Sequence, residues 1–189
     1  KLMKVIIDLR DLENTEVRAY LARNLREQKA LEVLSDDEAD TVKIALLDNP
    51  HISKEIVQYL LKNKSECVRA KALTHESIGR ADLSIMTADP SNLVKRELAQ
   101  QAKIARKDLL KLLSEPNEII VAAAVQNPTI QAKDLLKLSK HPSLFVRYSV
   151  LSIAVQRKMY EVVLNMLDDT DDHLREEVEK VIKRIKSRK

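Results

Sequence analysis

The hydrophobic and polar positions of the chain repeat with a period of about 26 residues. One aliphatic residue, followed in six of seven cases by Lys or Arg, marks each period: Val17-Arg18, Val42-Lys43, Val68-Arg69, Val94-Lys95, Ile120-Val121, Val146-Arg147 and Leu174-Arg175. Subtracting successive numbers gives steps of 25, 26, 26, 26, 26 and 28 residues, and Pro90, Pro116 and Pro142 keep the same step. Because a fixed period of this size is typical of repeat proteins, the pattern predicts a chain of repeated units.

Each unit has the pattern of two short helices. The first, the A helix, begins at the anchor pair, where "LVKRELAQQ" places Val94, Leu98 and Ala99 on one face. The second, the B helix, is typified by "KDLLKLLS", with Leu109 and Leu112 facing inward. Such short helices are marginal alone, so their apolar faces must be buried against neighbouring units. The sequence therefore predicts an all-α fold, a single α-solenoid domain over residues 1–189 with about six 26-residue repeats starting near 17, 42, 68, 94, 120 and 146.

The two ends of the chain also follow the repeat. Ile6 and Leu9 fall where Val57 and Leu60 fall in a later unit, which indicates that the chain starts inside a repeat, in a B helix. The last segment, 172–189, is long and heavily charged. We expect it to form a capping helix with a polar outer face over the end of the core.

Two stretches resemble a known family. "NPHISKEIVQYLLKNKSECVRAKAL" (49–73) and "NPTIQAKDLLKLSKHPSLFVRYSVL" (127–151) share Asn-Pro, an acidic residue, paired aliphatics and Val-Arg before a helix rich in small residues. This pattern resembles the leucine-rich repeat variant family, which is similar to HEAT and armadillo-like helical repeats. The resemblance implies a right-handed stack of short helix pairs and implies no reaction. Some members carry a Cys-rich iron–sulfur segment, which Cys67 alone does not match.

Composition narrows the classes of function. The chain has 44% hydrophobic and 3% aromatic residues, a single Gly and a single Cys. One Gly disfavours a dinucleotide-binding domain, and one Cys excludes a disulfide framework or a multi-Cys metal site. No apolar stretch approaches the roughly 20 residues of a membrane span. We therefore expect a cytoplasmic, non-enzymatic protein without cofactors, while its oligomeric state stays open.

A ladder of basic residues follows the anchors and allows two interpretations. Its members are Arg18, Lys43, Arg69, Lys95, Arg147 and Arg175. They could form a track for a polyanion. Alternatively, they could pair with the residue five positions before an anchor, which is Asp37, Asn63, Asp89, Glu115, His141 or Asp169. The second interpretation is favoured, because repeat proteins reuse positions for packing.

The outer face of the B helices is the candidate binding surface. Its predicted contact residues are Lys107, Lys111, Lys133, Lys137, Lys140, Arg106, Arg80 and Ile85. The same column predicts Met159, Val163 and Met166 on the outside of the last unit. If B helices line the concave side, the surface suits an acidic protein segment. The alternative is sequence-independent binding of a nucleic-acid backbone by the same lysines, and an ordinary solvated face would look the same.

Two further candidates are weaker. Cys67 and His75 stand at opposite ends of one short helix, too far apart for a thiol–imidazole pair. "DDTDDHLREEVE" spaces its acids like a calcium loop, but His173 stands where such a loop needs Gly. Acids at the start of the last helix explain it more simply, since they complement exposed amides.

Overall fold

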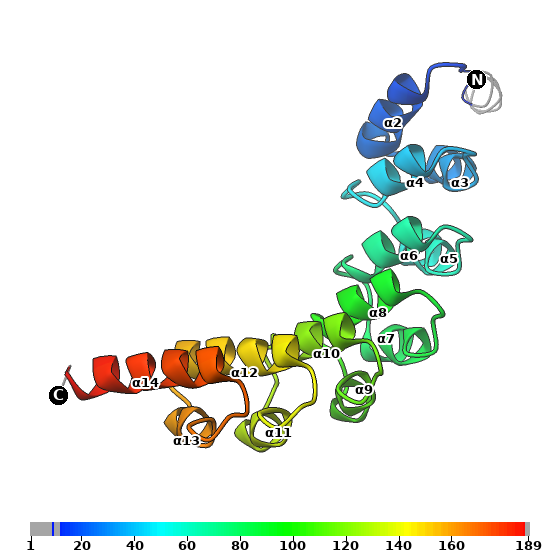
Figure 1. The fold of residues 1–189 in the computed structure, drawn as a ribbon. Coiled ribbons are helices and arrows are strands. Elements are labelled where there is room, and N and C mark those ends of the chain that lie inside the picture. Colours follow the sequence, from blue (N-terminus) through cyan, green and yellow to red (C-terminus); the bar gives the residue numbers. More distant parts are fainter. Residues whose placement is uncertain (1–8, 10–11, 188–189) are drawn as a thin grey trace. The chain divides into compact units, whose positions relative to one another are not determined.

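The protein is all-α over the part that the computed structural model describes, which is residue 9 and residues 12–187 (Figure 1). The expectation for Ile6 lies outside these residues. The described part has thirteen helices and no strands: α2 (Thr15–Asn24), α3 (Gln28–Ser35), α4 (Asp40–Leu46), α5 (Lys54–Leu60), α6 (Glu66–Leu73), α7 (Arg80–Met86), α8 (Asn92–Ala99), α9 (Arg106–Leu112), α10 (Glu118–Val125), α11 (Ala132–Leu138), α12 (Leu144–Gln156), α13 (Tyr160–Leu164) and α14 (Asp172–Lys186). The chain divides into two compact units, one ending at Leu98 and the other beginning at Ala99.

The starts of the helices keep the step read from the sequence. The even-numbered A helices begin at residues 15, 40, 66, 92, 118, 144 and 172, and the B helices α3 to α13 at 28, 54, 80, 106, 132 and 160. Each A helix therefore begins two residues before its anchor pair, not at the pair as expected. In five of the seven A helices, a side chain three positions before the anchor caps the helix; Ala39 and Ser65, at the same position of α4 and α6, make no such bond. At Asn117 and Asp171, for example, the side chain accepts a backbone N–H of the first turn, from Ile119 at 2.9 Å and from Leu174 at 2.9 Å.

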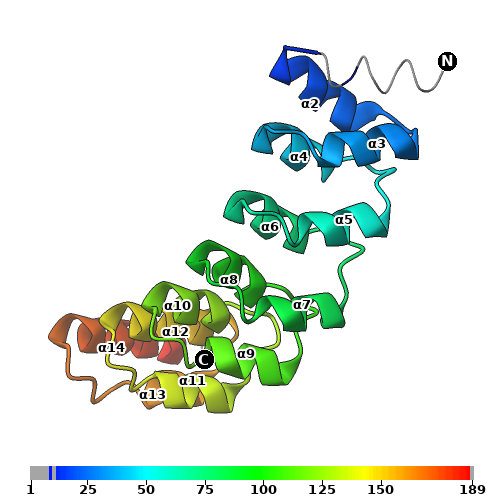
Figure 2. The same cartoon turned by 90° about the vertical axis from the view of Figure 1, so that its right-hand side faces the viewer.

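Within each unit the A helices pack on one another and the B helices pack beside them. In the first unit α4 lies against α2 and α6, while α3 and α5 contact α4 and α6 respectively (Figures 1 and 2). In the second unit α12 lies against α10 and α14, while α11 and α13 contact α12. Each unit has its own core with fully buried leucines from its B helices, among them Leu31, Leu60 and Leu83 in the first unit and Leu109 and Leu135 in the second. Burial of each leucine stabilises the fold by about 1.5–3 kcal/mol.

The last helix pair departs from the 26-residue register. α12 has 13 residues, and Lys158 after it adopts a φ of 56°, in the left-handed region that reverses the chain. α13 consequently begins 28 residues after α11. The prediction that Val163 and Met166 face solvent is therefore wrong: they are 1% and 0% exposed, while Leu164 is 53% exposed.

Candidate binding surface

Three of the four ladder arginines, Arg18, Arg69 and Arg147, are held inside the fold rather than presented to solvent. Arg147 on α12 donates from Nε and Nη2 to the two carboxylate oxygens of Asp169, at 2.8 and 3.0 Å. Its Nη1 donates to the carbonyls of His141 and Pro142 at 2.9 and 3.1 Å. A bidentate guanidinium–carboxylate pair is the strong form of a charge-assisted hydrogen bond. This arginine thus joins the turn before its own helix to the turn before α14.

The same arrangement recurs wherever the ladder carries Arg followed by Asp in the next turn. Arg69 pairs with Asp89 at 2.7 and 3.0 Å, and Arg18 pairs with Asp37 at 2.7 and 3.2 Å. The ion-pair interpretation is therefore confirmed for these three arginines. One unit has Val121 at the ladder position instead of a basic residue. The following turn has His141 where the paired units have Asp, so both members of the ion pair are replaced together.

The carboxylates of Asp169 and Asp89 have lowered pKa values. Burial alone would raise the pKa of Asp169, but the hydrogen bonds from Arg147 and from the Asp171 N–H, together with the Arg147 charge, outweigh it and lower the pKa. The pKa of Asp89 is lowered in the same way by Arg69 and the Ser91 N–H. These acids are therefore charged at neutral pH and act as fixed parts of the packing.

A second inter-helix bridge was not predicted from the sequence. The side-chain amide of Asn127, which is fully buried, donates to the carbonyls of Ala99 and Gln101 at 2.6 and 3.1 Å. Asn49 does the same to Ala22 and Leu25, at 2.7 and 2.8 Å. Asn127 follows α10 and binds carbonyls at the end of α8, and Asn49 follows α4 and binds carbonyls at the end of α2. Such carbonyls have no partner within their own helix. The recurring Asn-Pro was the available signal, although it points equally well to a simple turn.

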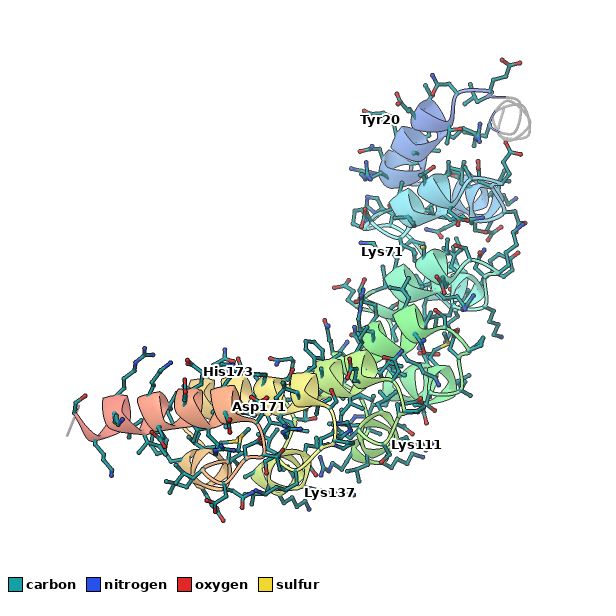
Figure 3. All side chains as sticks on the ribbon, in the orientation of Figure 1. Tyr20, Lys71, Lys111, Lys137, Asp171 and His173 are labelled. Atoms are coloured by element: carbon teal, nitrogen blue, oxygen red, sulfur yellow. The ribbon has the colours of Figure 1, made fainter. Side chains whose placement is uncertain are left out.

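The lysines singled out from the sequence are exposed on two neighbouring B helices. Lys107 and Lys111 lie on α9, Lys133 and Lys137 lie on α11, and Lys140 follows α11. Figure 3 shows Lys111 and Lys137 on the side of their helices that faces away from α10 and α12. We call these five residues the lysine face.

The acids of α9 and α11 are turned inward. Asp108 is 0% and Asp134 is 8% exposed, so the exposed charged residues of each helix are all cations. Asp134 accepts from the Nη2 of Arg106 at 2.5 Å, and this predicted contact residue is thereby tied to the neighbouring helix. Three of the other four B helices differ, because α3, α5 and α13 expose Glu32, Glu55 and Glu161, whereas the only exposed charged residue of α7 is Arg80. Two exposed cations without an exposed carboxylate are thus particular to α9 and α11 among these six helices.

The remaining predicted contact residues belong to the first unit. Arg80 and Ile85 lie on α7, where Arg80 is exposed and the Ile85 side chain is 72% exposed. A residue that the sequence did not single out is Leu110 on α9, which is 44% exposed beside Lys107 and Lys111. In the sequence Leu109-Leu110 is an ordinary leucine pair, and only its first member is buried.

No catalytic or metal-binding cluster is evident in the described part of the chain. Cys67 is a free, exposed thiol, and His75 Nδ1 lies 2.9 Å from Ser77 Oγ. Asp171 and His173 stand at the start of α14, as Figure 3 shows, and Asp171 caps that helix as expected. No three His, Cys, Asp or Glu side chains of these residues are grouped to hold a metal ion. Nor does any helix among them have the length and apolar character needed to cross a membrane.

Comparison with protein-family models, with curated proteins and with solved structures finds no match for this chain. The function must therefore be argued from the surface that the chain presents. The lysine face is the feature of that surface with the most defined chemistry.

Proposed function

We propose that the protein is a non-enzymatic scaffold that binds an acidic segment of another protein through the lysine face. We further propose that its helices form a right-handed α-solenoid of about six 26-residue repeats, similar to HEAT and leucine-rich repeat variant proteins. In such a stack, side chains at equivalent positions of successive units form columns on one surface. Lys107 and Lys133 form one such column, and Lys111 and Lys137 form another.

One observation carries the proposal: α9 and α11 expose cations and keep their carboxylates inside. Asp108 and Asp134 are buried and pair with Lys111 at 3.0 Å and with Arg106 at 2.5 Å. Neither helix therefore exposes a carboxylate, unlike α5, which exposes Glu55 beside Lys54. A surface whose exposed charged residues are all cations attracts anionic partners and speeds their encounter.

A protein segment fits this surface better than a nucleic acid does. Leu110, 44% exposed, adds an apolar contact between charged groups, which suits a partner with both carboxylates and aliphatic side chains. Neither α9 nor α11 contains an aromatic residue on which bases could stack. A backbone-only polyanion contact would use the lysines and leave Leu110 unused.

The test is a pull-down with the tagged protein from a cell lysate, with and without nuclease, compared with a variant carrying Lys107→Glu, Lys111→Glu, Lys133→Glu and Lys137→Glu. The matched control carries the same four charge reversals at exposed lysines of the first unit, namely Lys29, Lys54, Lys62 and Lys64. We expect proteins that are retained equally with and without nuclease and are lost only with the first variant. Recovery that depends on intact nucleic acid would contradict the proposal.

A further inference from the structure

The seam between α9 and α11 has a defined side on each helix. Arg106 on α9 and Asp134 on α11 form an ion pair of 2.5 Å, with side chains 31% and 8% exposed. Both views of the ribbon place the two helices side by side (Figures 1 and 2). The side of α9 that carries Arg106 therefore faces α11.

Leu110 lies on that same side of α9. It follows Arg106 by four residues, and residues four apart share a helix face. The first unit supports this placement independently. Gln58, 52 residues before Leu110 and so two 26-residue steps away, donates to Asp82 at 2.9 Å, and Asp82 is 52 residues before Asp134. The position of Leu110 thus faces the next B helix. In this unit Arg106, not residue 110, donates to Asp134, and the Leu110 side chain stays 44% exposed.

Lysines border this apolar position on both helices. Lys107 and Lys111 lie on the α9 side, and Lys133 and Lys137 lie on the α11 side, all exposed. The four-residue spacing sets the Cβ atoms of the two lysines of each helix about 6 Å apart. The axes of packed helices lie about 8–10 Å apart. The result is a leucine in a seam with two cations on each side, of which Lys111 also contacts the buried Asp108 carboxylate at 3.0 Å and keeps a side chain that is 61% exposed.

We propose that this seam binds an acidic amphipathic helix, which places an aliphatic side chain on Leu110 and carboxylates on the lysines of both sides. The inference rests on the proposed function, since it assumes that the lysine face binds an acidic protein segment. A helix lying along the seam can direct one row of side chains at Leu110 and a further row at the lysines on each side. The core and flanking positions of a coiled coil are arranged in this way. An extended strand directs its side chains in only two opposite directions, so it cannot reach Leu110 and both lysine pairs together.

The neighbouring seam lacks these features. Leu136 takes the Leu110 position on α11, but the facing helix α13 exposes Glu161 instead of lysines. Lys140 is also engaged there, donating from Nζ to the carbonyl of Asn165 at 3.1 Å. Charge complementarity to an acidic helix is therefore confined, within the second unit, to the α9–α11 seam.

The experiment uses the full chain and two fluorescent peptides of about 18 residues, long enough for measurable helicity. One peptide spaces leucines at i, i+3 and i+7 with Glu on both flanks, and the other has the same composition in scrambled order. Fluorescence anisotropy gives the Kd of each. The protein variants are Leu110→Ser, the volume-conserving Leu110→Met, Lys137→Glu and, as a matched control, Leu164→Ser, which changes a 53% exposed leucine on α13.

We expect the amphipathic peptide to bind about tenfold more tightly than the scrambled one, because only it brings leucine and Glu to the seam together. Leu110→Ser should weaken the amphipathic peptide about fivefold and leave the scrambled peptide unchanged, whereas Leu110→Met and Leu164→Ser should change neither. Lys137→Glu should weaken both peptides.

Three results would overturn the inference, and they are distinguishable. If both peptides bind equally and both lose binding with Lys137→Glu, the protein binds an acidic segment but does not require it to be an amphipathic helix. If the amphipathic peptide binds more tightly but Leu110→Ser has no effect, the peptide binds as a helix at a place other than the α9–α11 seam. Failure of the protein to bind either peptide would contradict both the inference and the proposed function.

Discussion

Arg147 on α12 and Asp169 in the turn before α14 form a bidentate ion pair whose side chains are 10% and 2% exposed. The pair joins the turn before α12 to the turn before α14, and Arg147 also holds two carbonyls of its own turn. This side chain therefore fixes the distance between neighbouring A helices. A position that looks like a track of surface charge is in fact part of the packing.

Replacing Arg147 with Ala should lower the free energy of unfolding by about 3 kcal/mol or more, because the Asp169 carboxylate would remain buried without its partner. Arg23→Ala serves as the control, since Arg23 is 53% exposed and lies 3.6 Å from Asp48. That change should cost less than about 1 kcal/mol. Urea unfolding of both variants measures the difference. Equal losses would mean that the buried pair has no special role.

The pH dependence of stability follows from the lowered pKa of Asp169 and Asp89. A carboxylate whose pKa is lower in the folded than in the unfolded state stabilises the fold above its unfolded pKa of about 3.9. That contribution is lost as the pH falls below about 4 and through the folded pKa. We expect the free energy of unfolding to decrease between pH 5 and pH 3, and to decrease less in a variant carrying Asp89→Asn and Asp169→Asn. A variant with the same pH slope as the natural chain would contradict this account.

Asn127→Ala should destabilise the second unit by about 2–4 kcal/mol, because the carbonyls of Ala99 and Gln101 lose their donor in a buried site. Asn24→Ala is the control, since the Asn24 amide donates to the Tyr20 carbonyl at 2.8 Å at an exposed position. That replacement should change the free energy of unfolding by less than about 0.5 kcal/mol. Thermal or urea unfolding distinguishes the bridge from a dispensable turn residue.

The sequence predicts the fold correctly at positions where the recurring residue type has only one structural role. The all-α class and the step between helices follow from the recurring aliphatic anchors, and the pairing of Arg69 with Asp89 follows from their fixed spacing. The two-residue shift of the A-helix starts could also have been read from the Ser and Asn caps, since a cap must precede the first turn.

Features that depend on contact between helices could not be read in this way. Leu110 is half of an ordinary leucine pair, and only the Arg106–Asp134 contact reveals that it borders a neighbouring helix. The register of α13 depends on the left-handed turn at Lys158, a conformation that a lysine rarely adopts. Extrapolating a 26-residue step across that turn placed Met166 on the wrong side.

The corrected register of α13 makes its own prediction. Met166→Ser should lower the free energy of unfolding by about 2–5 kcal/mol, because it removes a side chain that is 0% exposed and adds a hydroxyl to the core. Leu164→Ser, at a 53% exposed position, should change it by less than about 1 kcal/mol. The reverse order of losses would restore the uninterrupted 26-residue register.

The lysine face is proposed to bind acidic protein rather than nucleic acid. The most direct measurement titrates the purified chain against a labelled Glu-rich peptide and a labelled DNA duplex over a series of salt concentrations. We predict tighter binding of the peptide at physiological salt, lost when Lys107, Lys111, Lys133 and Lys137 are changed to Glu. Tighter binding of DNA, with a slope of log K against log salt of about −3 to −4 as four phosphate contacts would give, would contradict the account.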